Sequence, residues 1–293
     1  MGGSIYLLNG QHTITARFLA VGLLAAFVFP IGCGKDPAAQ AKRLVEVGNR
    51  YYQAGKYAQA SIVYRRAIQK QPRYGQAYYW LGLTEIKRNN NGAAIASLHR
   101  AFDLPGPGYD AYEPLAEILL RLLHLDRLAA KRVSRALTDL NVREEQRNPG
   151  SLHLPRIRGE IALLEGKPDE AAKWFRLAIS RDPSRYETAA LLFQALVAAQ
   201  KLPEAEALAE ATLSQHKDFD VLYERLSTVY ERQRRWADVE RIRKAHLENL
   251  PARINPRLAL ARFYLRRGRR AEGMAVLQAV LDNPKEFPGG RHQ

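Results

Sequence analysis

Residues 41–74, AKRLVEVGNRYYQAGKYAQASIVYRRAIQKQPRY, contain the pattern that decides the fold of this chain. Apolar and small residues recur at helical spacing in two runs: Leu44, Val47, Gly48 and Tyr51, then Ala60, Tyr64, Ala67 and Ile68. Gly55 stands between the runs and Pro72 follows the second one, where residues that end helices are expected. The stretch therefore predicts two helices joined by a short turn, which is a helical hairpin.

This hairpin pattern returns with a period of 34 residues, in copies that begin at residues 41, 75, about 109, 152, 186, 220 and 254. Eight residues of the first copy stand at the fixed offsets of a known repeat: Gly48, Tyr51, Gly55, Tyr57, Ala60, Tyr64, Ala67 and Pro72. The chain thus closely resembles the tetratricopeptide-repeat family. The resemblance implies an all-α fold, a right-handed superhelical α-solenoid of about seven hairpins behind an amino-terminal signal or anchor segment.

One interval between copies is longer than the period. The third copy begins near residue 109 and the fourth at 152, which leaves nine residues more than one period. The polar stretch Arg143–Gly150 accounts for this surplus. We therefore predict an inserted polar loop over 142–151 between repeats 1–3 (41–141) and repeats 4–7 (152–283). A tolerated surface insertion, a hinge and a binding loop are alternative interpretations of this loop.

The first 33 residues have the pattern of a secretory signal peptide. The apolar run FLAVGLLAAFVF covers residues 18–29, and it is shorter than the roughly 20 residues that a membrane span needs. Ile31-Gly32-Cys33 then resembles a bacterial lipobox and contains the single cysteine of the chain. The resemblance implies that Cys33 is lipidated, that 34–40 is a linker, and that the protein faces the periplasm, on the outer membrane because Gly34 is no retention signal. An uncleaved signal anchor is the alternative.

The sequence offers no pattern of catalytic residues. The chain has 45 lysines and arginines against 30 acidic residues and a formal charge of +15, to which the first 32 residues contribute only Arg17. Its seven histidines form no pair four residues apart of the kind that binds zinc from one helix. Gly55-Lys56 and Gly166-Lys167 lack the glycine spacing and the hydroxyl of a phosphate-binding loop. We therefore expect no enzyme, no cofactor and no metal site.

The candidate binding site is the concave face of the solenoid. In the family that the chain resembles, the first helix of each hairpin lines this face, and its second, fifth, ninth, twelfth and thirteenth positions meet the ligand. The resemblance implies a peptide-binding groove with an acidic middle and basic ends, formed by Lys42, Asn49, Tyr52, Gln53, Gln76, Tyr79, Lys87, Asp110, Glu113, Glu117, Arg121, Arg156, Glu160, Gln194, Glu224, Glu231, Arg232, Arg262 and Arg266. For each residue taken singly, solvated helix surface is the alternative interpretation.

Two classes of function are compatible with these features. The first is an envelope-anchored scaffold that binds partner proteins or peptides. Its opening helix, with Tyr51-Tyr52 and Gly55-Lys56-Tyr57, also resembles tetratricopeptide-repeat lipoproteins of exopolysaccharide export and protein sorting. The second class is a module that binds acidic polysaccharide or anionic lipid through the arginines of the last two repeats, Arg232, Arg234, Arg235, Arg241, Arg243, Arg262, Arg266, Arg267, Arg269 and Arg270. Nucleic acid is disfavoured as a partner because of the export signal.

The carboxyl-terminal repeat lacks a polar closing helix. Its second helix carries five apolar residues, Met274, Val276, Leu277, Val280 and Leu281. The tail over 284–293 contains too much proline and glycine to form another helix, so we expect it to be flexible. The last hairpin is therefore expected to be the least stable part of the solenoid, or a contact surface for a partner or a second copy of the chain.

Overall fold

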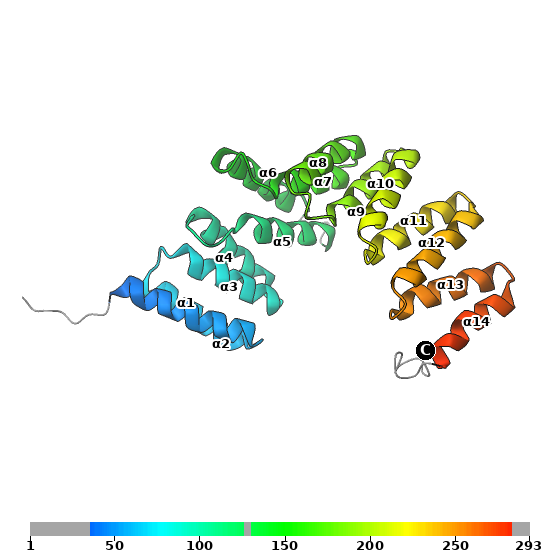
Figure 1. The fold of residues 1–293 in the computed structure, drawn as a ribbon. Helices are drawn as coiled ribbons and strands as arrows, with labels where there is room; N and C mark the ends of the chain where they lie inside the picture. Colours follow the sequence, from blue (N-terminus) through cyan, green and yellow to red (C-terminus); the bar gives the residue numbers. More distant parts are fainter. Residues whose placement is uncertain (1–35, 126–129, 283–293) are drawn as a thin grey trace, which may run out of the picture.

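The structure, a computed structural model, describes residues 36–125 and 130–282, which form fourteen helices and no strand (Figure 1). The helices pair in chain order into seven hairpins. The first helices of the hairpins are α1 (Pro37–Gln53), α3 (Gly75–Lys87), α5 (Tyr112–Leu125), α7 (Leu154–Leu164), α9 (Thr188–Ala198), α11 (Asp220–Arg232) and α13 (Ile254–Arg266). The second helices are α2 (Tyr57–Lys70), α4 (Asn91–Asp103), α6 (Ala130–Arg147), α8 (Pro168–Arg181), α10 (Leu202–Gln215), α12 (Trp236–Asn249) and α14 (Arg270–Leu281). The predicted all-α solenoid is confirmed.

The hairpins follow one another in an extended, curved row (Figure 1). The second helix of each hairpin packs on the first helix of the next hairpin, and several first helices also touch, as α5 and α7 do. Buried apolar residues accordingly form three successive clusters, the first over α1–α3, the second over α4–α7 and the third over α7–α13. Within the described ranges no single central core holds the chain together, and each hairpin depends on its neighbours for stability.

The turn inside the hairpins recurs at one repeat position. The residue that ends the first helix has a positive φ in six hairpins, at Gly55, Asn89, Gly166, Gln200, Arg234 and Gly268. The next backbone N–H donates to the carbonyl five residues before it, as in Lys56 N to Tyr51 O at 2.9 Å and Arg235 N to Tyr230 O at 2.9 Å. This is the Schellman ending of an α-helix. The 34-residue spacing of these turns confirms the period read from the sequence, and the longer step from Asn89 to Gly166 confirms the surplus between repeats 3 and 4.

Small residues bring the two helices of a hairpin together. A Cβ atom on Gly48 would lie 2.4 Å from Cε1 of Tyr64, and one on Gly159 would lie 2.5 Å from Cε1 of Phe175. Both rings are completely buried. These two hairpins therefore require glycine at the eighth position of the repeat, opposite a large residue of the second helix, because the interior is already closely packed.

The prediction of a polar loop over 142–151 is wrong for most of this stretch. Helix α6 continues through this stretch to Arg147. The polar side chains there bind the preceding hairpin: the guanidinium of Arg147 lies 3.6 Å from the centroid of the Phe102 ring, and it pairs with the buried Glu144 at 3.1 Å. The surplus residues thus lengthen a helix that packs on α4, and the connection to α7 begins only at Asn148.

The first helix also begins earlier than predicted. Asp36 accepts a hydrogen bond from the backbone N–H of Ala38 at 3.0 Å, and Pro37 occupies the first helical position, where proline is favoured. Residues 37–40, predicted as part of a linker, therefore belong to α1. The predicted signal peptide (1–33), its Cys33 and the tail (284–293) lie outside the described residues.

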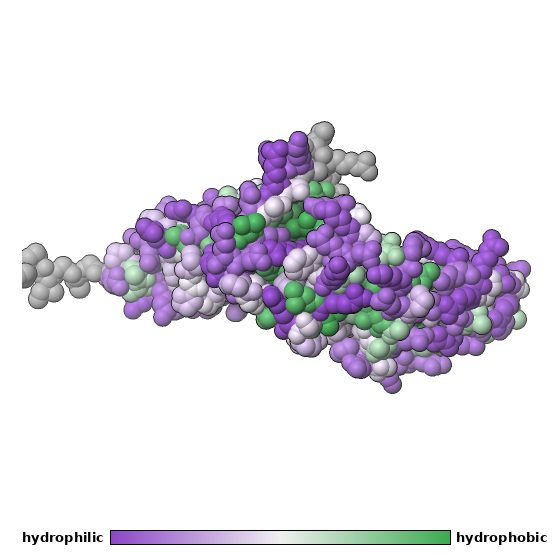
Figure 2. Space-filling model, turned by 90° about the horizontal axis from the view of Figure 1, so that it is seen from above, coloured by the Kyte–Doolittle hydropathy of each residue, from purple (hydrophilic) through white to green (hydrophobic). Residues whose placement is uncertain are grey.

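The surface carries apolar residues in separate places. Figure 2 shows, on the face that it draws, hydrophobic patches set between hydrophilic residues. The exposed large apolar side chains include Ile62, Val142, Val221, Leu265 and Met274, which belong to different helices. Among residues 36–125 and 130–282, no helix is both long enough and apolar enough to cross a membrane.

Candidate functional site

Three neighbouring cavities of about 590, 340 and 500 Å³ lie along the first helices of hairpins 3 to 7. The first is lined by residues of α5, α7, α9 and α11 and of the loop before α9, the second by α9 and α11, and the third mainly by α11 and α13. Arg225 of α11 lines all three cavities, and Val221 and Glu224 each line two of them. We call this surface the inner groove. Its lining comes mainly from first helices, and binding at this face stays a prediction.

The amino-terminal cavity of the inner groove contains a network of ion pairs. Glu113 of α5 accepts from Arg156 of α7 at 3.2 Å and from Arg185, in the loop before α9, at 2.5 Å. Arg156 also pairs with Glu117 and Glu160, and its side chain is only 10 % exposed. Four predicted groove residues are therefore in mutual contact. The three carboxylates of the expected acidic middle are therefore compensated in part by two arginines.

The charge state of Glu113 follows from these contacts. Burial alone would raise the pKa of this carboxyl, but the hydrogen bond from Arg185, together with His153 and Arg156, holds the pKa below its usual value. Glu113 is therefore ionised at neutral pH, and its Oε1 accepts hydrogen bonds from the guanidinium groups of Arg156 and Arg185. This favours a positioning role for Glu113 within the groove wall over a role as a proton donor.

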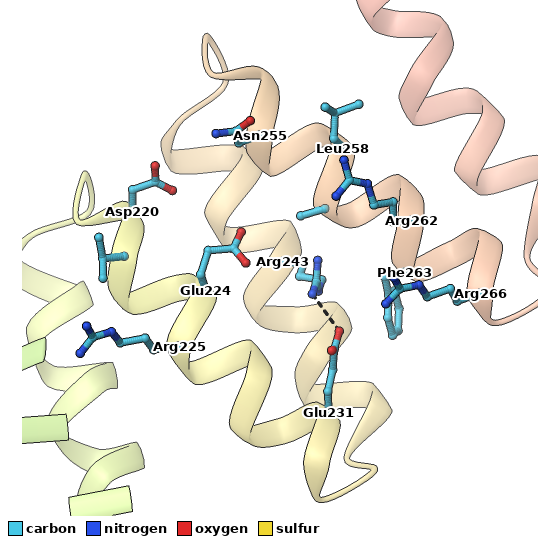
Figure 3. Close-up of a pocket in the computed structure, with 12 residues that line it drawn as sticks. Asp220, Glu224, Arg225, Glu231, Arg243, Asn255, Leu258, Arg262, Phe263 and Arg266 are labelled. Atoms are coloured by element: carbon cyan, nitrogen blue, oxygen red, sulfur yellow. Dashed lines mark hydrogen bonds and ion pairs between the residues drawn. The ribbon is translucent and has the colours of Figure 1, made fainter. Parts of the chain in front are cut away.

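The carboxyl-terminal cavity lies between α11 and α13, with α12 behind it (Figure 3). It brings together the predicted residues Glu224, Glu231, Arg262 and Arg266. Glu231 pairs with Arg243 of α12 at 2.8 Å. Arg262 and Arg266 project from α13 toward the cavity, as Figure 3 shows, and neither makes an ion pair with any residue of the described chain.

The middle cavity contains the remaining predicted residues of this half, Gln194 and Arg232. Both side chains are exposed, Gln194 on α9 and Arg232 at the end of α11. Both are therefore accessible to a ligand that lies along the groove.

The predicted residues of repeats 1 and 2 are not part of the inner groove as defined by these cavities. Asn49 is engaged in the hairpin itself, because its Oδ1 accepts from the buried Tyr64 hydroxyl at 2.7 Å. Gln76 accepts from Tyr74 at 2.6 Å. The other residues predicted here, together with two from repeat 3, lie on the surface or in ring contacts: Lys42, Tyr52, Gln53, Tyr79, Lys87, Asp110 and Arg121. Their role in binding stays a prediction.

A row of aromatic rings occupies the corresponding surface of repeats 1 and 2. Tyr52 of α1 meets Trp80 of α3 edge to face at 5.5 Å between centroids, Trp80 meets Tyr79 at 5.5 Å, and Tyr79 meets Tyr109 at 5.3 Å. The amino-terminal repeats thus present rings where the later repeats present charges. Ring contacts of this kind stabilise neighbouring hairpins against each other.

Several residues of the inner groove were not predicted from the sequence. Arg185 lies in a loop and Arg243 on a second helix, so neither stands at a position that the repeat pattern marks. Arg225 stands at the sixth position of its repeat, one residue beside a marked one. Asn255 and Leu258 stand at the second and fifth positions of repeat 7, so the pattern itself could have identified them.

No group of three or more histidine, cysteine, aspartate or glutamate side chains within the described part of the chain is placed to hold a metal ion. The groove has carboxylates and guanidinium groups, and many of them pair with one another. Such a lining can contact a ligand through charge, hydrogen bonds and apolar side chains.

Comparison with family models identifies the repeats. A model described as TPR repeat matches residues 48–85, and two models described as tetratricopeptide repeat match residues 123–186 and 162–228. The chain is a tetratricopeptide-repeat protein. The matches cover hairpins on both sides of the surplus between repeats 3 and 4, so both halves of the solenoid consist of the same unit.

Solved tetratricopeptide-repeat structures share this fold. TTC0263, a thermophilic TPR protein of Thermus thermophilus, is 23% identical over 64% of this chain and 97% of its own, with a TM-score of 0.51. MamA 41-end from Desulfovibrio magneticus RS-1 is 12% identical over 62% and 97%, also with a TM-score of 0.51. The APC/C hetero-tetramer Cut9–Hcn1 is 15% identical over 76% of this chain and 42% of the other, with a TM-score of 0.58. At these identities the likeness concerns the fold alone.

Proposed function

We propose that this tetratricopeptide-repeat protein is a scaffold that holds an extended segment of a partner protein in its inner groove. The observation that carries the proposal is that three neighbouring cavities between α5 and α13 share a lining residue, Arg225. Tetratricopeptide-repeat proteins act as scaffolds for protein interactions, and solenoids use their extended concave surfaces for this purpose.

The composition of the groove wall suits a polypeptide. Apolar side chains such as Leu191, Phe219 and Val221 line it together with guanidinium and carboxylate groups. An extended peptide can present both apolar and charged side chains to such a wall, because alternate side chains point to the same side, and its backbone groups need hydrogen-bond partners.

A photo-cross-linking amino acid at Gln194 tests the groove as the binding face. Gln194 is exposed in the middle cavity, and Ala207, exposed on α10 of the same hairpin, is the matched control position. With membrane extract of the source cells, we expect discrete cross-linked partners from Gln194 and none of them from Ala207. The same set of partners at both positions, or none at either, would contradict the proposal.

The scaffold is proposed to be tethered to the cell envelope through a lipidated Cys33, facing the periplasm, and on the outer membrane. The support is the lipobox-like Ile31-Gly32-Cys33 after an apolar run, with the first helix beginning at Pro37. The resemblance of the opening repeat to exopolysaccharide-export lipoproteins extends the proposal to a role in that process.

Replacement of Cys33 by serine tests the tether. In bacterial cells fed a fatty-acid probe, we expect the wild-type protein to be labelled and Cys33→Ser to remain unlabelled, because serine has no thiol to acylate. Gly34→Ser, at the neighbouring position, is the control that should keep the label. Equal labelling of wild type and Cys33→Ser, or no label on either, argues against a lipid anchor.

The alternative function is the binding of a polyanion by the arginines of the last two repeats. Ion pairs between some of these arginines and glutamates of the same chain weaken this alternative. Arg235 pairs with Glu206 at 2.7 Å, Arg241 with Glu210 at 2.7 Å and Arg243 with Glu231 at 2.8 Å, while Arg269 pairs with Glu240 and Glu272. Four of the ten arginines predicted for the basic surface are therefore compensated within the protein. A partner that meets only the unpaired arginines fits these contacts better than a long polymer.

A further inference from the structure

Two adjacent arginines at the carboxyl-terminal end of the inner groove have no counter-charge. Arg262 and Arg266 are exposed, stand four residues apart on α13 and project toward the cavity that Figure 3 shows. None of the ion pairs in residues 36–125 and 130–282 includes either of them, although twelve residues line the cavity and three of these are acidic.

None of the acidic residues of this cavity makes an ion pair with Arg262 or Arg266. Asp220 pairs with the ring of His246 at 2.5 Å and with Arg253 at 2.9 Å. Glu231 pairs with Arg243, and Glu224 lies 3.8 Å from Nδ1 of His246. The positive charge of Arg262 and Arg266 is therefore left for a ligand. Arg225 adds a third positive charge to the same cavity; it is half-buried, and its guanidinium donates a hydrogen bond to the backbone carbonyl of Ala190.

The distance between the two arginines along α13 is close to the distance between alternate side chains of an extended peptide. Residues four apart on an α-helix are about 6 Å apart along the axis. In an extended polypeptide, side chains two residues apart point to the same side and are about 6.6 Å apart. Guanidinium groups bind carboxylates through paired, charge-assisted hydrogen bonds. Two carboxylates at alternate positions of an extended peptide would thus meet Arg262 and Arg266 in register.

An apolar residue lies one helical step before Arg262 on the same face of α13. Leu258 stands one further helical step before Arg262, is partly exposed, and lines the same cavity as Val221 of α11, which is 47% exposed. A peptide residue two positions from the first carboxylate would come over these two side chains. Burying an apolar side chain there removes both exposed residues from water.

We propose that this end of the inner groove binds an acidic segment of a partner polypeptide in which an apolar residue and two acidic residues occupy alternate positions, with Leu258, Arg262 and Arg266 as their respective contacts. The inference rests on the proposed function and adds the chemistry of the partner. An acidic polysaccharide would supply the charges but not the apolar residue in register.

Fluorescence anisotropy with a labelled peptide of the pattern Leu-Ser-Glu-Ser-Glu, added to the full chain in detergent, tests this inference. We expect the peptide to bind, and Arg262→Gln with Arg266→Gln to weaken binding about tenfold or more, because two charge-assisted hydrogen-bonded contacts are lost. Arg234→Gln with Arg270→Gln, which removes the same charge from exposed positions outside the cavity, is expected to change binding less than about twofold. Glu224→Gln is expected to strengthen binding, since a like charge is removed from the cavity.

Reversal of charge provides a test that does not depend on loss of binding. Arg262→Glu with Arg266→Glu is expected to bind Leu-Ser-Lys-Ser-Lys better than the original peptide. A peptide with adjacent glutamates, Leu-Ser-Ser-Glu-Glu, is expected to bind the wild type more weakly than the alternate pattern, because neighbouring side chains point to opposite sides.

Three results would overturn the inference. The first is an equal loss of peptide affinity in the Arg262→Gln, Arg266→Gln variant and in the Arg234→Gln, Arg270→Gln control. The second is no binding of the acidic peptide by the wild type, and the third is displacement of the bound peptide by polygalacturonate at equal concentration of charge. In each case, cross-linking of partners at Gln194 still decides the proposed function separately. If Gln194 captures partners while the acidic peptide does not bind, the groove is a binding face for a segment of other chemistry.

Discussion

Replacement of Gly48 by leucine is expected to lower the free energy of unfolding of the amino-terminal hairpin by about 2–3 kcal/mol. A Cβ atom at this position would lie 2.4 Å from Cε1 of Tyr64 and 2.8 Å from its Cζ. The Tyr64 ring is fully buried and its hydroxyl donates to Asn49 at 2.7 Å, so the ring has no free space into which it can move. The leucine must therefore force α1 and α2 apart.

Hydrogen exchange of α1 and α2, together with thermal unfolding followed by circular dichroism, measures this effect. Gly92→Leu is the matched control, because Gly92 lies in the first turn of α4 with no atom within 4 Å of a Cβ placed there. That variant is expected to be neutral or slightly stabilising, since glycine inside a helix costs about 0.5–1 kcal/mol relative to alanine. Equal unfolding of Gly48→Leu and wild type would show that the close approach of the two helices is not needed.

The hairpins and their period could be predicted because the determinants are local. Gly55, Gly166 and Gly268 end first helices with a positive φ, which glycine adopts without steric cost, and they recur at one repeat position. Gly48 and Gly159 likewise stand opposite a large residue of their own hairpin, 16 residues further on. Such contacts lie within one period, so the repeat pattern contains them.

The end of α6 could not be predicted because its determinants lie in another hairpin. The sequence Arg143–Gly150 is as polar as a loop. Arg143 and Arg147 stand four residues apart, and both guanidinium groups lie over the ring of Phe102, at 4.8 and 3.6 Å from its centroid. This contact keeps the polar stretch helical, and it joins residues that are more than one repeat apart.

The candidate site could be predicted only in part, because some of its contacts also join different hairpins. The repeat positions marked Glu113, Arg156, Arg262 and Arg266, and all four line cavities of the inner groove, because side-chain direction follows from helical register. They could not show that Arg185, in a loop, reaches Glu113, because that contact spans 72 residues. Which charges of the groove are paired and which are free is decided by such contacts between hairpins, and only the free charges are available to a partner.

The carboxyl-terminal hairpin, α13 and α14, is expected to exchange its amide hydrogens about a hundredfold faster than the central helix α8. In α8, Ala171, Phe175 and Ala178 are buried between α7 and α9. In the last hairpin, Leu265 is 41% and Met274 52% exposed. Because solenoid stability depends on contacts between neighbouring hairpins, a hairpin whose large apolar side chains stay exposed is expected to open with less free energy.

Hydrogen exchange of the full chain at several protein concentrations measures this difference and separates its two explanations. If a second copy covers Leu265 and Met274, protection of α14 should rise with concentration, and Met274→Lys should abolish that rise because a charge would have to be buried at the contact. Ile62→Lys, at a site that is 54% exposed on α2, is the matched control and should leave the exchange of α14 unchanged. Protection of α14 equal to that of α8 at all concentrations, in a sample shown to be monomeric, would mean that the last hairpin is closed by contacts of its own chain.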